Sequence, residues 1–172
     1  TPASAATTTT PASTLATYWA TAQNAARAGR WQEVLTNLLL IQQTDPTFNR
    51  IEVTEQLVAA YVNLALEKDN ADALEEALAL YEKALALKPT ADIARERDLI
   101  ELYLDVLAYT GVEWPVVIQE LQALYALEPD YRDVEQRLQE AHIAYADQLV
   151  DEEAWCMAQD EYNQAISVVS AP

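Results

Sequence analysis

The sequence is poor in the residues that interrupt regular structure and in the residues that carry most enzyme chemistry. Its 172 residues include 2 glycines, 7 prolines, one cysteine and one histidine. A single cysteine excludes a disulfide within the chain. No glycine-rich loop for binding phosphate is present, and the sequence supports neither catalysis nor a cofactor.

Basic residues are scarce as well, with 10 lysines and arginines against 28 acidic residues and a formal charge of −18. Nucleic acids and anionic membrane surfaces are bound through lysine and arginine, so this balance argues against both as partners. The charge leaves two interpretations open. Either the acidic surface only keeps the protein in solution, or it attracts a basic partner.

Long apolar runs are also missing, since no stretch approaches the roughly 20 residues that cross a bilayer. The first fourteen residues, TPASAATTTTPAST, contain only Thr, Pro, Ala and Ser. We expect residues 1–14 to form a disordered linker because they have nothing to bury. Such linkers often join a membrane anchor to an extracytoplasmic domain, which predicts the extracytoplasmic domain of a membrane-tethered bacterial protein. The alternatives are a plain flexible tail and a cytoplasmic protein.

The remainder is rich in Ala, Leu, Glu and Gln, which favour helices. Apolar residues make up 51% of the chain, enough for a real core in a domain of this length. We therefore predict an all-α protein.

Four segments share one pattern, which opens at Trp31, Leu74, Trp114 and Trp155, spaced 43, 40 and 41 residues apart. Apolar or small residues follow at offsets of 3, 7 and 10, which lie on one face of a helix. Proline follows at an offset of fifteen in the first three segments, at Pro46, Pro89 and Pro129. Proline ends helices, so the pattern indicates a repeated unit with a helix of constant length.

The turn before each of these helices differs between segments. Gly29 and Gly111 precede two of them and suit the left-handed conformation that ends a helix. The other two turns are polar, and Asp72 with Glu75 has the spacing of a capping box.

These residues resemble the tetratricopeptide repeat, a helix–turn–helix unit of about 34 residues with the pattern W-x₂-L-G-x₂-Y…A-x₃-F…P. The stretch LEEALALYEKALALKP matches its second half best, while the first half is looser and the units are longer. The resemblance implies an α-solenoid of antiparallel helix pairs, a right-handed superhelix of about eight helices over residues 15–172. The repeats would be 15–46, 50–89, 91–129 and 131–170.

Stacked repeats share a continuous core, and the repeated tryptophan is expected to fill the joint between neighbouring pairs. We predict the following core residues: Trp31, Leu38, Tyr61, Leu74, Tyr81, Trp114, Leu121, Trp155 and Tyr162.

The resemblance also implies that the first helix of each pair lines an inner, concave face where peptides or helices dock. Carboxylates recur there at helical spacing, for example at Asp98, Glu101 and Asp105. The predicted groove consists of Glu52, Glu55, Asn63, Asp98, Glu101, Asp105, Tyr109, Glu140, Asp147 and Asp151. We expect a non-enzymatic scaffold that binds a basic peptide or helical segment of a protein partner in this acidic groove.

Other functions are weaker alternatives. His142 and Cys156 fall in one repeat and could form a nucleophilic pair, but both lie in periodic helix. The carboxylates at 69–72 and 151–153 lack the spacing of a calcium loop, so no metal site is expected. A self-associating structural domain, with a possible homodimer, and an accessory sensor domain of a larger signalling enzyme remain open.

Overall fold

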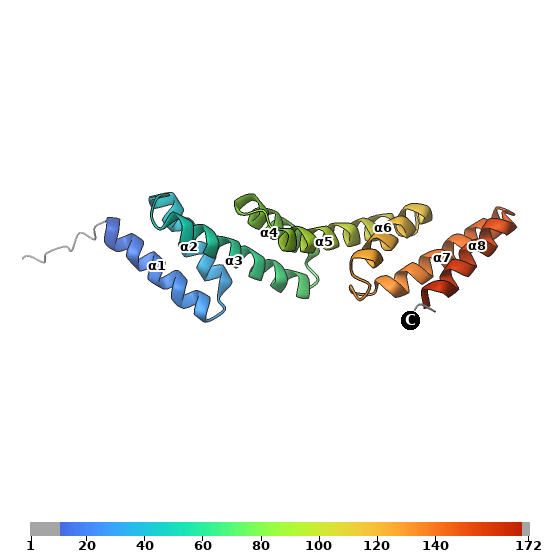
Figure 1. Ribbon diagram of the computed structural model, residues 1–172, viewed down its shortest axis with the longest axis horizontal. Coiled ribbons are helices and arrows are strands. Elements are labelled where there is room, and N and C mark those ends of the chain that lie inside the picture. The colour runs from blue at the N-terminus through green and yellow to red at the C-terminus, as the bar shows by residue number, and fades with distance from the viewer. Residues whose placement is uncertain (1–10, 170–172) are drawn as a thin grey trace, which may run out of the picture. The chain divides into compact units, whose positions relative to one another are not determined.

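The structure, a computed structural model, describes residues 11–169, which form helices and short connections without any strand. Figure 1 shows the helices in chain order. Their bounds are α1 Pro11–Arg27, α2 Trp31–Thr44, α3 Arg50–Asn70, α4 Leu74–Leu87, α5 Ala91–Tyr109, α6 Trp114–Leu127, α7 Val134–Asp151 and α8 Trp155–Val169. None of them is long and apolar enough to cross a membrane.

The helices pack against their neighbours in sequence, as in an α-solenoid, and the predicted all-α fold is confirmed. The chain divides into two compact units, one ending at Ala94 and the other beginning at Arg95. In the first unit α1 packs on α2, α2 on α3 and α3 on α4. In the second unit α6 packs on α7 and α7 on α8 (Figure 1).

The first helix begins earlier than the sequence predicted. α1 starts at Pro11, so residues 11–14, which we assigned to the linker, are helical. Proline is favourable at the first position of a helix because its missing N–H would have no partner there. The rest of the predicted linker, residues 1–10, lies outside the described residues.

The three prolines end their helices by the same backbone geometry. Asp45, Lys88 and Glu128 precede them and are extended, with φ of −151°, −150° and −153°. Each N–H still donates to the carbonyl four residues earlier, at 2.8 to 2.9 Å. A residue before proline avoids the helical region, so the chain must leave the helix at this point. Ser170, where the pattern fails in the fourth segment, lies outside the described residues.

The turns between paired helices also repeat, although their residues differ. Gly29, Asp72 and Glu153 are left-handed, with φ of 68°, 60° and 61°. The next N–H donates to the carbonyl five residues back at 3.0, 2.9 and 2.8 Å, which is the Schellman arrangement. Asp72 is therefore part of the turn, and the predicted capping box is wrong, because α4 has Ala73 as its N-cap. In the third turn Gly111 has φ of 82° and one more residue precedes α6.

Each unit has its own core. In the first, residues from α1, α2 and α3 form one cluster that includes Ala22, Leu38 and Leu57. Among the predicted core residues, Leu38, Leu74, Tyr81 and Leu121 are buried, while Trp31, Tyr61, Trp114 and Tyr162 are partly exposed. Trp155 is 62% exposed, so its placement in the core was wrong. Trp31 and Trp114 begin helices that pack on a following helix, and no helix follows α8 within the described residues.

Candidate functional site

In the first unit two of the three predicted groove residues border an open hollow of about 630 Å³. Glu52 and Glu55 line it beside Ile51, which is 72% exposed. The hollow is not purely acidic, because Lys88 lies 3.6 Å from Glu55 and Arg50 also lines it. Mixed charge makes this hollow the weaker half of the predicted site.

The side-chain amide of Asn63, the third predicted groove residue of the first unit, bonds to its own helix. Its side chain is partly buried, and the Nδ2 atom donates a 2.7 Å hydrogen bond to the carbonyl of Ala59 on the same helix. This bond occupies one donor of the amide and holds the side chain against α3.

In the second unit the carboxylates of α5 differ in their ion pairs. The Nε atom of Arg97 lies 2.6 Å from Asp98 and 3.8 Å from Glu101, so one guanidinium serves both. Asp105 and Tyr109 are exposed further along the helix. Within residues 11–169 no ion pair involves Asp105, so its charge is uncompensated.

On α7 all three predicted carboxylates are exposed. Glu140 accepts a 2.7 Å hydrogen bond from Gln136, and Asp147 accepts one from the phenol of Tyr162 on α8. The bond to Asp147 raises the pKa of Tyr162, as do burial and the negative charges of Asp147 and Asp151. Both carboxylates therefore lie near the Tyr162 phenol.

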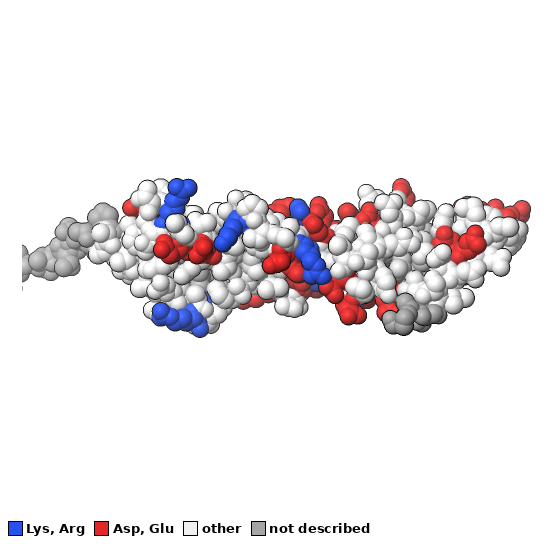
Figure 2. Space-filling model, viewed as in Figure 1, with Lys and Arg blue, Asp and Glu red and all other residues white. Residues whose placement is uncertain are grey.

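The arginines are confined to one part of the second unit. It contains Arg95, Arg97, Arg132 and Arg137, and the seven acidic residues after Arg137 have no lysine or arginine among them. On the face drawn in Figure 2, α7 and α8 show red atoms and no blue ones. The negative charge of the last helix pair is therefore the least compensated in the protein.

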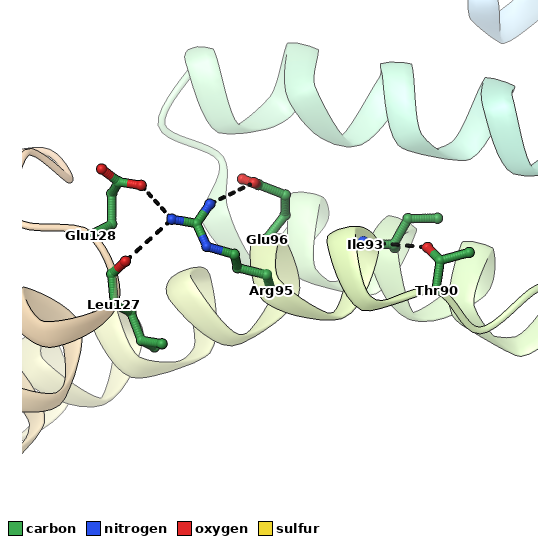
Figure 3. A network of polar contacts seen from close by, with 6 residues as sticks. All are labelled: Thr90, Ile93, Arg95, Glu96, Leu127 and Glu128. Atoms are coloured by element: carbon green, nitrogen blue, oxygen red, sulfur yellow. Dashed lines mark hydrogen bonds and ion pairs between the residues drawn. The ribbon is translucent and has the colours of Figure 1, made fainter.

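All four of these arginines have structural partners, and those of Arg97 are the carboxylates of α5. Arg95 reaches the carboxylate of Glu128 and donates a 3.2 Å hydrogen bond to the carbonyl of Leu127, which closes the end of α6 (Figure 3). A cation at a helix C-terminus is favourable because it meets the unpaired carbonyls. The same figure shows the side chain of Thr90 accepting a 3.4 Å hydrogen bond from the N–H of Ile93 at the start of α5.

A second cluster joins α5 to the start of α7. The rings of Tyr103 and Tyr131 meet edge to face, with centroids 5.9 Å apart. The guanidinium of Arg132 lies 5.3 Å from the centroid of Tyr103, and that of Arg137 lies 5.6 Å from it. Such cation–π contacts hold both arginines against the aromatic rings. The sequence reasoning missed this cluster, although the run YRDVEQR contains three of its four members, Tyr131, Arg132 and Arg137.

Sequence reasoning also missed a small cavity of about 160 Å³ beside Trp114. Its apolar wall includes Val106 and Leu121, and Arg137 with Glu140 supplies the polar part. The lining residues are Val106, Thr110, Trp114, Val117, Leu121, Arg137, Glu140, Ala141 and Ala144. In the sequence, the small side chains of Ala141 and Ala144 were the feature that could have indicated a cavity here. The cavity places Glu140 beside a pocket as well as in the predicted groove.

His142 and Cys156 lie in different environments, one buried and one exposed. His142 is 3% exposed, and its Nδ1 atom lies 2.6 Å from the carboxylate of Glu161, so it bridges α7 and α8. Cys156 is exposed in the first turn of α8. Within the described residues no group of three or more His, Cys, Asp or Glu side chains is placed to hold a metal ion.

Comparison with protein-family models finds no match, and comparison with curated proteins finds no significant relative.

Proposed function

We propose that this protein is a non-enzymatic interaction module that binds a basic peptide or helical segment through the exposed carboxylates of α5 and α7. The observation that carries the proposal is the charge of the second unit, which holds seventeen of the 28 acidic residues but four of the ten basic ones. Complementary charge would raise the rate of association and select basic partners over acidic ones.

The exposed carboxylates recur at helical spacing, so an extended or helical ligand would meet several of them in turn. Asp98, Glu101 and Asp105 are three and four residues apart on α5, and Glu140, Asp147 and Asp151 are seven and four residues apart on α7, again on one side of the helix. Tyr109 is 42% exposed at the end of α5 and offers apolar contact. The same proposal includes two further points: membership of the tetratricopeptide repeat family and a tethered extracytoplasmic location. They rest on the repeat pattern and on the composition of residues 1–14.

The proposal is tested by fluorescence anisotropy with two labelled peptides of equal length, one rich in lysine and one rich in glutamate. We expect the lysine peptide to bind, with an affinity that falls as salt rises. The double variant Glu101→Lys with Asp105→Lys should weaken it at least tenfold.

The matched control is Glu75→Lys with Glu82→Lys, which makes the same change in charge at exposed positions of α4. This control should leave the affinity within about twofold of the unaltered protein. Equal weakening by both double variants would mean that only net charge matters, and it would remove the α5 surface from the proposal.

A further inference from the structure

The small cavity beside Trp114 lies within the second unit and is lined by residues of α5, α6 and α7. Its volume of about 160 Å³ is close to that of an engineered protein cavity, about 150 Å³, which binds benzene. Its inner wall is buried, since Val106, Val117 and Leu121 are at most 1% exposed. The cavity is therefore a hollow in the core, large enough for one small organic molecule.

Polar and exposed residues line the other side of the cavity. Thr110 and Glu140 are exposed, and Arg137 is partly buried. Arg137 donates through Nε to Asp133, and Glu140 accepts at Oε1 from Gln136, so each charged group keeps further atoms for hydrogen bonds. A molecule can enter from the solvent on this side, and a polar group on it would meet a guanidinium and a carboxylate.

Two alanines of α7 leave the space open. Ala141 and Ala144 are three residues apart, so they lie on the same side of the helix, and both line the cavity. Ala141 is 2% exposed and Ala144 is partly buried. The volume therefore depends on two small side chains, and a larger residue at either position would reduce it.

Water is a poor occupant of the inner part of this cavity. A buried water usually makes about three hydrogen bonds, whereas the buried side chains of the lining are all aliphatic. An empty cavity is unfavourable too, because the atoms around it lose packing contacts. A molecule with an apolar body would restore those contacts, and its binding would stabilise the folded protein.

We propose that this cavity binds a small neutral aromatic molecule of about the size of phenol. The ring would lie among Val117, Leu121 and the indole of Trp114, because aromatic rings pack favourably edge to face. The hydroxyl would accept a hydrogen bond from Arg137 and donate one to Glu140. A neutral ligand is favoured because one positive and one negative side chain line the opening, so a charged ligand would be repelled by one of them. The site shares Glu140 alone with the function proposed above and does not rest on it.

The test titrates phenol into the full chain by isothermal titration calorimetry. We expect saturable binding of one phenol per chain. Benzoate and benzylammonium carry a negative or a positive charge near the place of the hydroxyl, and both should bind at least tenfold more weakly. In nuclear magnetic resonance spectra, the ring protons of phenol should show nuclear Overhauser contacts to the methyl groups of Val117 and Leu121.

One variant fills the cavity without changing the charge of the protein. Ala144→Leu should weaken the binding of phenol at least tenfold while helical circular dichroism is unchanged. Ala123→Leu adds the same side chain at an exposed position of α6 and should leave the affinity within about twofold. Glu101→Lys with Asp105→Lys should also leave it unchanged, which separates this site from the α5 surface. The nuclear Overhauser contacts are measured on the unaltered protein, so they locate the ligand even where Ala144→Leu does not fold.

Four results would overturn the proposal. The first is the absence of saturable phenol binding. The second is equally tight binding of benzoate or benzylammonium, which would show a charged ligand. The third is full affinity in folded Ala144→Leu, or contacts of phenol to other methyl groups only, which would place the ligand elsewhere. The fourth is a lysine peptide that binds more tightly with a phenylalanine than with an alanine and displaces phenol, which would make a side chain of a protein partner the occupant.

Discussion

The phenol of Tyr103 on α5 donates a 2.8 Å hydrogen bond to Oδ1 of Asp133, the N-cap residue immediately before α7. The same oxygen accepts a 2.8 Å hydrogen bond from Nε of Arg137. Tyr103 is buried, and its ring contacts the guanidinium groups of Arg132 and Arg137. One carboxylate therefore joins the start of α7 to α5 through two hydrogen bonds.

Tyr103→Phe tests the contribution of this hydrogen bond to stability. We expect the free energy of unfolding to fall by about 1 kcal/mol, because the buried ring is kept while the bond to Asp133 is lost. Urea denaturation of the whole chain measures the change. Tyr109→Phe is the matched control, since Tyr109 is exposed on the same helix and should change stability by less than about 0.5 kcal/mol.

The same carboxylate predicts a dependence of stability on pH. Burial by itself raises the pKa of Asp133, but the hydrogen bonds from Arg137 and Tyr103 outweigh it, and the net pKa lies below the ordinary 3.8. A carboxyl whose pKa is lower in the folded protein stabilises it above the unfolded pKa, and this contribution is lost as the pH falls through the folded pKa. We therefore expect the contribution to be complete above about pH 4 and to decline below it.

Asp133→Asn removes this titration while keeping an oxygen that can accept from Tyr103. Urea denaturation between pH 5 and pH 2.5 should show a shallower loss of stability for the variant than for the unaltered protein. Parallel curves would show that the carboxylate is equally easy to protonate in the folded and unfolded chains.

The repeated tryptophans should differ in their effect on stability. Trp114 packs at a joint covered by α7 and lines the small cavity, so Trp114→Ala should destabilise the protein by about 3 kcal/mol. Trp155 holds the same place in the repeat but is 62% exposed, and Trp155→Ala should change stability by less than about 0.5 kcal/mol. Similar losses for both variants in chemical denaturation would show that α8 is covered in solution.

The left-handed turns allow opposite substitutions to be compared. Gly29 has φ of 68°, and nothing lies within 4 Å of the methyl group that alanine would add. We expect Gly29→Ala to lower the free energy of unfolding by about 1 kcal/mol, because alanine is strained in this left-handed conformation. Glu153→Gly should stabilise by about 0.5 kcal/mol by relieving the same conformation. Glu152→Gly is the control for charge, because Glu152 has φ of −85° and gains nothing from glycine. Thermal unfolding of the three variants measures the differences.

Much of the fold could be predicted from the sequence because it depends on local chemistry. The interval from Trp31 to Pro46 sets the length of one helix, and proline ends that helix whatever the tertiary packing. Gly29 and Gly111 indicated two of the four turns for a similar reason. The other two turns were recognised only by their polar residues, and their left-handed residues were not predicted, since the hydrogen bonds of the turn hold Asp72 and Glu153 in that conformation.

The candidate site was less predictable. Helical spacing could place Asp98, Glu101 and Asp105 on one face, but not show that Arg97 compensates the first two. The partners of Tyr103 come from residues about thirty positions away, which only packing brings together. Asn63 was assigned to the groove by spacing, and only the structure shows that its amide also donates to a carbonyl of its own helix.

The sequence by itself determined the all-helical fold of residues 11–169 and the excess of negative charge, because spacing, propensity and composition are properties of the chain. The tertiary structure decided which members of the repeat are covered. Trp114 and Trp155 occupy equivalent positions in the sequence, yet within residues 11–169 only Trp114 begins a helix with a following helix packed on it. Burial depends on the neighbours of a residue, and a repeated pattern by itself cannot show which of its members are covered.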